Sequence, residues 1–562
     1  MTRAPGPAPA PIAAPSLAPR TRALVLAIAA VFFVLPLTLG IPLLDPDEGL
    51  HAAIAQEMVE RGDWVTPRLL GEPFLDKPIL FFWALAASIA ALPDGEFAVK
   101  LPGLAFGALG ALATALLAGR WFGRRAGWLG FIAYATLLLP LALAQAAVHD
   151  VALVPWTTLA MLALWQASEA RGWQRACAFG ALAGVWLGLS ILTKALTGVA
   201  LIGLPFFVWT LVTRRLTPRL VAAGAVSLAV AVVLASPWYW AMEHANPGYL
   251  HYYFVERHLL GYATTTQLHG HRAWWYYLPI LAGGALPWWP YALRTLRGVC
   301  TGQRPAVLLA WTWLVVDVGF LSLAGSKLLT YLLPAFPAIA VLAAVAWDEG
   351  VREEAGAAGW PAWGGLHVAG LLPLAMMMGG ASLVVGRQVG VSVGLAGWVA
   401  IALSAGAWVG ALVVALRRAR RLALEAILTS WVVTGLVALL VILPRVAPAF
   451  TARELARHYN RVGALPAGLL FFDERVGSFL YYLDPPLRAQ VTTSRLTRVR
   501  PDEALRMRQA PPGTYIIVPV EEMAKLDRRF RLSATPSVLA GHHRIFEASA
   551  FAEAVRAVTG GR

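Results

Sequence analysis

Residues 45–86 read DPDEGLHAAIAQEMVERGDWVTPRLLGEPFLDKPILFFWALA, and this stretch decides how the rest of the chain is interpreted. Three carboxylates, Asp45, Asp47 and Glu48, stand within four residues directly after an apolar run. Asp45 suits the N-cap of a helix, Pro46 its first position, and Glu48 the closing residue of a capping box. Because Asp45 already serves as the cap, we expect the carboxylate of Asp47 to be free to face a cavity.

The same stretch also has a purely structural interpretation. Acidic groups favour the first turn of any helix, because they oppose the helix dipole. The apolar positions Ile54, Ala55 and Met58 describe an amphipathic helix that lies on a membrane surface. Further along, Asp76-Lys77-Pro78 places a cation beside the next apolar segment. The residues alone leave open whether the acidic turn caps a helix or carries chemistry.

The composition identifies a membrane protein. The chain has 562 residues, of which 58% are hydrophobic and 14% are charged, whereas about a quarter of the residues of a soluble domain are charged. The formal charge of +15 could suggest a nucleic-acid partner. We do not expect one, because Arg and Lys stand mainly in short loops between apolar runs rather than on one folded face.

Apolar runs long enough to cross a bilayer recur through most of the chain. We count about thirteen spans, and we interpret the stretch from 176 to 213, interrupted by Thr193-Lys194, as two short spans with a tight turn. The predicted spans are 23–43, 101–119, 126–145, 150–168, 176–192, 198–213, 219–236, 274–293, 306–323, 328–346, 364–384, 391–416 and 424–443.

The charges predict the orientation of these spans. With thirteen spans, the basic clusters all fall on one side, which the positive-inside rule makes cytoplasmic. The C-terminus then lies outside. These clusters are Arg20 and Arg22; Arg120, Arg124 and Arg125; Arg171 and Arg175; Arg214, Arg215 and Arg219; Arg294, Arg297 and Arg304; and Arg417, Arg418, Arg420 and Arg421.

The predicted fold is an all-α polytopic membrane protein with a small C-terminal α/β domain outside the membrane. Leu469–Phe472 and Tyr515–Val518 have the pattern of short buried strands, and helical stretches are expected near 452–459 and 548–558. The expected parts are a disordered cytoplasmic tail (1–22), a transmembrane domain (23–445) with external loops 44–100 and 237–273, and the α/β domain (446–562).

Several motifs resemble one known group of enzymes. The run from Asp47 to Leu80 is similar to the first external loop of the aminoarabinose transferase and protein O-mannosyltransferase families, whose fold is called GT-C. The resemblance covers about residues 23–345 in the order of the family. The further matching motifs are Leu192-Thr193-Lys194, Pro237-Trp238-Tyr239, Phe254-Val255-Glu256 with His258, Trp274-Trp275-Tyr276-Tyr277, Ser326-Lys327-Leu328 and Tyr331-Leu332-Leu333-Pro334.

The resemblance implies an activity and roles for two residues. Such enzymes take a sugar from a polyprenyl phosphate and invert its anomeric centre. Asp47 matches the acidic residue at the centre of their site, and Lys77 matches the lysine that binds the donor phosphate. The chemistry agrees, because a phosphate leaves without protonation but needs cations to hold its charge. A carboxylate can in addition act as base toward a hydroxyl acceptor.

The sequence departs from the family pattern at two places. Leu50 and His51 replace the usual Arg-Tyr pair, and Gly261-Tyr262 stands where an Arg is usual after the long external loop. Two cations that bind the donor phosphate are therefore absent. By position, Arg257, His269, His271, Arg272 and Lys327 are the candidates to replace them.

His149-Asp150 opens the fourth predicted span. The structural explanation is a helix start; the functional one is a second carboxylate that orients Lys194 or the acceptor. Asp317 lies within an apolar span, where a charge is costly, and we assign it no role. The predicted site comprises catalytic Asp47, Glu48 and Asp150; Lys77, Lys194, Arg257, His258 and Lys327 binding the donor phosphate; and His51, Tyr331 and Trp275 lining the substrate.

Histidines are frequent between His244 and His271. His269 and His271, together with Glu256, have the donor atoms for a metal ion, but their spacing fits no fixed ligand motif. We expect no required cofactor, and we do not favour a divalent metal. Most aromatic residues near Trp274 fit the interfacial belt that anchors membrane spans, and stacking on a sugar is the alternative.

Three functions remain in view. The first is an inverting glycosyltransferase in a bacterial inner membrane, with a polyprenyl-phosphate sugar as donor and lipid A, a protein hydroxyl or another envelope glycan as acceptor. The second is a transporter or flippase for a lipid-linked substrate. Transporters typically have repeated halves and ionisable groups near the membrane midplane. The third is a catalytically silent homologue, which the absent arginines would explain.

Overall fold

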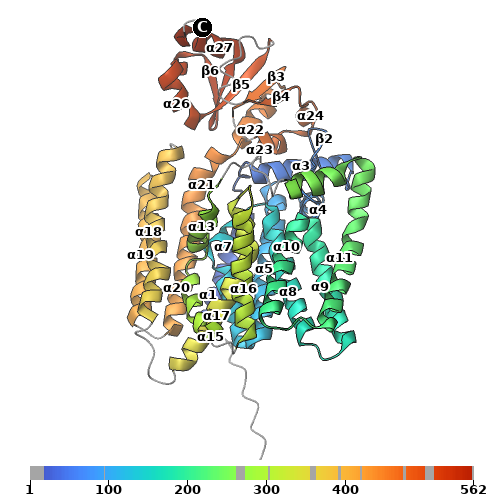
Figure 1. Cartoon of the computed structure of the whole chain (residues 1–562). Helices are drawn as coiled ribbons and strands as arrows, with labels where there is room; N and C mark the ends of the chain where they lie inside the picture. The colour runs from blue at the N-terminus through green and yellow to red at the C-terminus, as the bar shows by residue number, and fades with distance from the viewer. Residues whose placement is uncertain are drawn as a thin grey trace, which may run out of the picture.

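The structure is a computed structural model in which a helical bundle carries a small α/β domain at one end (Figure 1). It describes residues 18–93, 95–260, 272–300, 304–354, 363–389, 394–417, 420–472, 476–499 and 512–559. The C-terminal domain lies on the end of the bundle where α3 (Asp47–Arg61) lies, between the two parts.

Within the described residues, nine helices are long and apolar enough to cross a membrane, or ten if one bent pair forms a single span. The chain is therefore a multi-pass membrane protein. The nine are Pro19–Thr38, α5 (Glu96–Phe122), α8 (His149–Glu169), α9 (Trp173–Lys194), α11 (Pro218–Ala245), α16 (Pro305–Leu323), Leu329–Gly350 with most of α17 (Phe336–Glu354), α19 (Gly394–Arg417), and Arg421–Phe450, which begins with α20 (Arg420–Val437).

Shorter apolar helices complete the bundle. The bent pair is α6 (Arg124–Ala135) and α7 (Leu138–Ala144), which meet at 66°. The others are α4 (Leu80–Ala91), α10 (Leu196–Val212) and part of α18 (Gly364–Val389). Each of the thirteen predicted segments contains helix, while the count of thirteen spans stays a prediction.

Three details differ from the expectations. Residues 274–293 do not form one helix but η3 (Trp274–Tyr276), α13 (Tyr277–Gly284) and α14 (Trp289–Ala292). Proline at 287 and 290 explains the break between α13 and α14, because it lacks the amide donor that a continuous helix needs. In addition, α11 continues to Ala245 instead of ending at 236, and α4 is an apolar helix within the predicted loop 44–100.

The packing of α9 against α11 depends on glycines at every fourth residue. A methyl group on Gly180 would lie 2.9 Å from the carbonyl carbon of Ala223, and one on Gly184 would lie 2.7 Å from Cβ of Val230. Gly188 is the third member, and a methyl group there would lie 3.1 Å from Cβ of Leu234. Small residues at this spacing let two membrane helices approach backbone to backbone.

The C-terminal domain contains a five-stranded sheet with strand order β4-β3-β5-β7-β6. The strands β3 (Gly468–Phe471), β4 (Leu496–Arg498) and β5 (Thr514–Pro519) are parallel, and β7 (His543–Glu547) runs antiparallel to β5 and β6 (Ser537–Ala540). The predicted strands and both predicted helices are confirmed. The two predicted helices are α22 (Arg453–Val462) and α27 (Ala548–Thr559). The domain also contains α23 (Val476–Tyr482), the short α24 (Pro485–Arg488) and α26 (Val520–Phe530).

Alternation along β3 explains why helices cover both faces of the sheet. Leu469 and Phe471 pack with residues of α22 and α23, whereas Leu470 packs with residues of α26 and α27. Side chains that alternate along a strand point to opposite faces. The face covered by α22 and α23 is the one whose apolar cluster also includes Ala53 of α3.

Candidate functional site

The predicted capping of α3 is wrong. The helix begins at Asp47 after Pro46, and no side chain caps it. Asp45 instead accepts hydrogen bonds from the backbone N–H and the hydroxyl of Ser478 in the C-terminal domain. The local sequence favoured a cap, but a partner far along the chain competes for the same carboxylate.

Glu48 is a buried anchor. Its carboxylate lies 3.1 Å from Nζ of Lys100, and it accepts hydrogen bonds from the backbone N–H groups of Leu44 at 2.8 Å and Ala147 at 3.2 Å. Both partners of the ion pair are buried. These contacts fasten the start of α3 to α5 and to the segment that leads into α8. The catalytic role of Glu48 stays a prediction, because these contacts account for the residue structurally.

His51 continues this attachment one turn along α3. Its Nδ1 donates to the carbonyl of Ala147 at 2.7 Å, and its ring packs 4.6 Å from that of His149 and 5.7 Å from that of Phe82, centroid to centroid. Burial lowers the pKa of His51, against the opposing charge of Asp47. The ring is therefore neutral at pH 7 and well placed to fix the segment before α8.

Asp150, Lys194 and Tyr331 form a second buried cluster. Lys194 Nζ makes an ion pair and hydrogen bond with the carboxylate of Asp150, and it lies 3.6 Å from the centre of the Tyr331 ring. Asp150 also accepts from the side chain of Thr330. The structure thus brings together the ends of α8 and α9 with the segment before α17, an arrangement in which Asp150 orients Lys194.

Asp47 and Lys77 differ from these neighbours in having no fixed partner. Asp47 is exposed and Lys77 is half-buried. Within the described residues, neither side chain makes a hydrogen bond or an ion pair. The charges of both act on the ring of His51 and on the hydroxyl of Tyr331. An unpaired carboxylate and an unpaired ammonium therefore lie near the same two residues, His51 and Tyr331.

Asp76, next to Lys77, is paired. It accepts a hydrogen bond from the hydroxyl of Tyr252 at 2.8 Å and lies 3.3 Å from the guanidinium of Arg257. Burial and this hydrogen bond raise the pKa of Tyr252 to about 12. Arg257 also acts electrostatically on Tyr331. The structure thus places Arg257, a predicted substitute for the absent arginine, on the side of the cluster where Lys77 lies.

The remaining predicted residues are Lys327, Trp275 and His258. Lys327 is buried, and its Nζ donates to the backbone carbonyls of Ala324 at 2.6 Å and Arg272 at 3.3 Å. Trp275 is 53% exposed, so its substrate-lining role stays a prediction. The side chain of His258 lies outside the described residues, and so do His269 and His271. Among the residues that are described, no group of three His, Cys, Asp or Glu could hold a metal ion.

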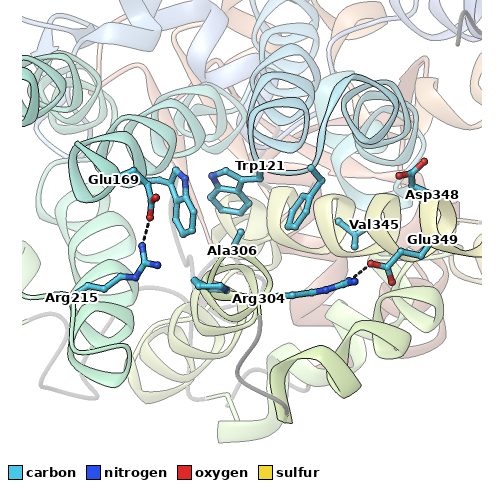
Figure 2. A pocket seen from close by; sticks show the side chains of 11 residues that line it. Trp121, Glu169, Arg215, Arg304, Ala306, Val345, Asp348 and Glu349 are labelled. Carbon is cyan, nitrogen blue, oxygen red and sulfur yellow. Dashed lines mark hydrogen bonds and ion pairs between the residues drawn. The ribbon is translucent and has the colours of Figure 1, made fainter. Parts of the chain in front are cut away.

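A cavity of about 740 Å³ lies at the opposite end of the bundle (Figure 2). Its lining includes the ion pairs Arg215–Glu169 and Arg304–Glu349. Glu169 ends α8, whose first residues, His149 and Asp150, belong to the clusters above. A helix of 21 residues is about 30 Å long, so the cavity is remote from Asp150 and the cluster around it.

Sequence reasoning missed the residues that hold the site in place. Lys100 stood at the edge of a predicted span, and a charge inside an apolar segment was a usable signal. Ser478 had no such signal, because its contact with Asp45 joins positions 433 residues apart in the chain.

Three comparisons bear on the identity of the chain. Residues 76–240 match the family model described as dolichyl-phosphate-mannose-protein mannosyltransferase. Proteins named undecaprenyl phosphate-alpha-4-amino-4-deoxy-L-arabinose arabinosyl transferase are similar in sequence. The one from Shewanella sediminis is 32% identical over 327 residues, which is 56% of this chain and 58% of that protein. The one from Pectobacterium carotovorum is 33% identical over 333 residues, 58% and 59% of the two chains. The match thus spans less than two thirds of these relatives.

Solved structures share the fold. ArnT from Cupriavidus metallidurans, bound to undecaprenyl phosphate, aligns with a TM-score of 0.71 at 23% identity, over 93% of this chain and 97% of that one. The oligosaccharyltransferase of Archaeoglobus fulgidus aligns with a TM-score of 0.54 at 12% identity, over 91% and 70%. The predicted fold is confirmed, and so is the resemblance on which it rested.

Proposed function

We propose, on the premise of its similarity in sequence and fold to the GT-C aminoarabinose transferases, that this chain is an inverting glycosyltransferase. The donor would be a sugar on a polyprenyl phosphate, and the relatives' names favour an aminopentose on undecaprenyl phosphate. The acceptor would be a glycolipid of the lipid A type in the cell envelope. The proposed reaction takes place on the periplasmic face of a bacterial inner membrane, at the end of the bundle that carries the C-terminal domain.

The observation that carries this proposal is the contrast between paired and unpaired charges. Glu48, Asp150 and Lys194 are each bound to protein partners, whereas Asp47 and Lys77 have none among the described residues. Because these charges have no protein partner, a ligand can bind them without first breaking an ion pair. A phosphate would suit the ammonium of Lys77, and an acceptor group would suit the carboxylate of Asp47.

The chemistry follows from these two groups. An acceptor oxygen attacks the anomeric carbon from the side opposite the phosphate, and the bond between that carbon and the phosphate oxygen breaks with its electron pair. Lys77, with Arg257 nearby, would hold the departing charge, which is worth several kcal/mol in a site poor in water. The proton of a hydroxyl acceptor would pass to Asp47. An acceptor phosphate has no such proton, and Asp47 would then orient it.

The roles of the buried pair differ in this proposal. Lys194 faces Asp150 and Tyr331, so it would bind the donor phosphate only by exchanging a partner it already has. We therefore propose that Lys194 shapes the positive field around the leaving phosphate, and that Asp150 keeps it in place. The transporter remains the alternative, although the ion pairs of the predicted site residues gather at one end of the bundle and not at its middle.

Reconstituted protein tests the proposal. Proteoliposomes would be given radiolabelled undecaprenyl-phosphate aminoarabinose with lipid A, and transferred label would be counted. Asp47→Asn should lower transfer by about 10²- to 10⁴-fold if the acceptor is a hydroxyl. Lys77→Met should lower it by about 10²-fold or more, and Lys77→Arg should recover part of it. Glu72→Gln, which changes an exposed carboxylate on the same loop, is the matched control.

Two results would contradict the proposal. Unchanged transfer by Asp47→Asn would remove this residue from the mechanism. Folded wild-type protein that transfers sugar to none of lipid A, protein or glycan acceptors would favour the transporter or the silent homologue. Movement of a fluorescent polyprenyl phosphate between leaflets would then separate those two.

A further inference from the structure

Helix α3 is enclosed from two sides. Ala52, Ile54, Ala55 and Met58 pack into an apolar cluster formed mainly by the bundle. Ala53, on another side of the helix, packs into the apolar cluster of the C-terminal domain. The residue that follows Pro46 at the start of this helix is Asp47. The position of the proposed catalytic carboxylate therefore depends on both parts of the molecule.

Backbone makes a close contact between the two parts. A methyl group on Gly49 of α3 would lie 2.9 Å from Cα of Ser478, and one on Gly477 of α23 would lie 2.5 Å from the carbonyl carbon of Gly49 and 2.6 Å from Cα of Leu50. Real Cβ atoms do not approach other atoms so closely, so glycine is required on both sides for α3 and α23 to pack in this way.

Hydrogen bonds hold the turn just before Asp47. The carboxylate of Asp45 accepts from the backbone N–H of Ser478 at 3.1 Å and from its hydroxyl. The backbone N–H of Asp45 donates to the carbonyl of Phe450 at 2.9 Å. Asp47 thus stands between two contacts with the C-terminal part of the chain, one through Asp45 and the other through Gly49.

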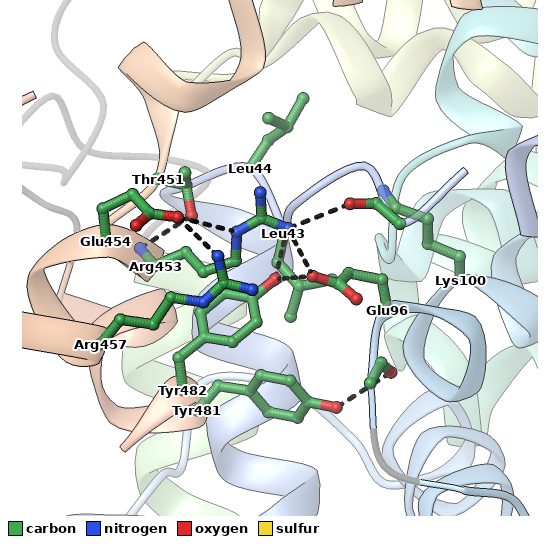
Figure 3. A network of polar contacts seen from close by, with 12 residues as sticks. Leu43, Leu44, Glu96, Lys100, Thr451, Arg453, Glu454, Arg457, Tyr481 and Tyr482 are labelled. Carbon is green, nitrogen blue, oxygen red and sulfur yellow. Dashed lines mark hydrogen bonds and ion pairs between the residues drawn. The ribbon is translucent and has the colours of Figure 1, made fainter. Parts of the chain in front are cut away.

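A second group of contacts holds the neighbouring start of α5 (Figure 3). The hydroxyl of Tyr482 donates to Glu96 at 2.9 Å and accepts from the backbone N–H of Leu43 at 3.0 Å. Arg453 donates to the same carboxylate at 3.0 Å and to the carbonyl of Gly40 at 3.0 Å. The C-terminal domain therefore contacts both ends of the segment that leads from the first span into α3, and also α5, which holds Glu48 through Lys100.

We propose that the C-terminal domain is a working part of the reaction site, and that Gly477 and Ser478 are positioning residues for Asp47. This inference rests on the proposed glycosyl transfer for its effect on rate, but not for the contact itself. Neither residue touches substrate. They fix the backbone on both sides of the carboxylate, so their loss would displace Asp47 while leaving Lys77 in place.

Kinetics of the full-length protein test the inference. Gly477→Ala forces α3 away and should lower kcat by about 100-fold, since a displacement of about 1 Å can cost that much. Ser478→Ala removes the hydroxyl contact and should lower kcat by about tenfold. KM for the donor should change by less than about twofold, because uniform binding is retained. Asp45→Asn keeps an acceptor for the Ser478 N–H and should recover most of the rate lost in Asp45→Ala.

A matched variant separates positioning from general disruption. Gly370→Ala introduces a comparable clash, 2.6 Å from the carbonyl oxygen of Pro287, in α18, which carries none of the proposed site residues. It should leave kcat per folded molecule near the wild-type value. An equal loss of kcat in Gly370→Ala and Gly477→Ala would overturn the inference.

Amide hydrogen exchange gives a readout that does not depend on transfer. In lipid nanodiscs, peptides covering α3 should exchange at least about tenfold faster in Ser478→Ala than in wild type, because exchange reports local opening. Peptides of α9 should be unchanged. Equal exchange of α3 in the two proteins would overturn the inference, whether or not the wild type transfers sugar. Faster exchange without any transfer would support the contact while rejecting the proposed function.

Discussion

Removing Lys100 should destabilise the protein, because it would leave Glu48 charged and buried without its cation. The two groups are 5% and 2% exposed, and their nearest atoms are 3.1 Å apart. Breaking one partner of a buried pair costs about 3–5 kcal/mol. The N–H groups of Leu44 and Ala147 still bind the carboxylate, so Lys100→Met should lie at the lower end, at about 3 kcal/mol.

The complementary change is more severe. Glu48→Gln keeps the acceptor oxygen but leaves the ammonium of Lys100 buried, so it should cost about 3–5 kcal/mol. The double variant removes both charges. Its loss should be smaller than the sum of the two single losses by about 2 kcal/mol, the coupling expected of residues in direct contact.

Unfolding by sodium dodecyl sulfate in mixed micelles, followed by tryptophan fluorescence, would give the three free energies. Additive losses, or a loss below about 1 kcal/mol for Lys100→Met, would refute the account of Glu48 as an anchor. The same proteins address catalysis. If the double variant is folded and still transfers sugar, the predicted catalytic role of Glu48 is wrong.

Three further results are expected. Lys194→Met removes the cation from a buried carboxylate and should lower the free energy of unfolding by about 3–5 kcal/mol. Tyr331→Phe keeps an aromatic face under Lys194 and should lower it by less than about 1 kcal/mol. Chemical unfolding of the two variants measures both losses. Burial lowers the pKa of His51 from its ordinary 6.5, so below that pH the unfolded chain binds a proton that the folded chain does not. The free energy of unfolding should therefore decrease as the pH is lowered, by up to about 1.4 kcal/mol per pH unit. Thermal unfolding from pH 7.5 to 5 should show a shallower fall for His51→Gln, and equal slopes would contradict the assignment. Gly435→Ala places a methyl group 2.5 Å from a phenylalanine ring of the first span and should cost about 1–3 kcal/mol, while Gly406→Ala, with open space around it, should cost nothing measurable in the same assay.

The bundle was predictable because its signal is local. Each span is an apolar run, and bilayer thickness fixes its length without reference to other parts of the chain. The break at residues 285–288 was less visible, since proline within a membrane helix is often tolerated. In α11 the helix passes through Pro237 without ending. The same residue type thus ended one helix and not another, and tertiary packing decides between them.

The site was predictable only in part. The run around Asp47 and Lys77 carries its own pattern, and the residues were chosen from it. The contacts that hold Asp47 in place, by contrast, join residues that are far apart in the chain. Asp45 looked like a cap, because capping involves residues only a few positions apart, but its partner is Ser478. No rule of local spacing connects two positions that meet only after the C-terminal domain has folded on the bundle.

The glycine seam between α9 and α11 has a mechanical consequence. Along this seam the two helices already lie at contact distance, so neither can move closer to the other. Lys194, the last residue of α9, is therefore held by a closely packed pair of helices. In the proposed function, a lipid phosphate would therefore meet an ammonium that the bundle already holds in place.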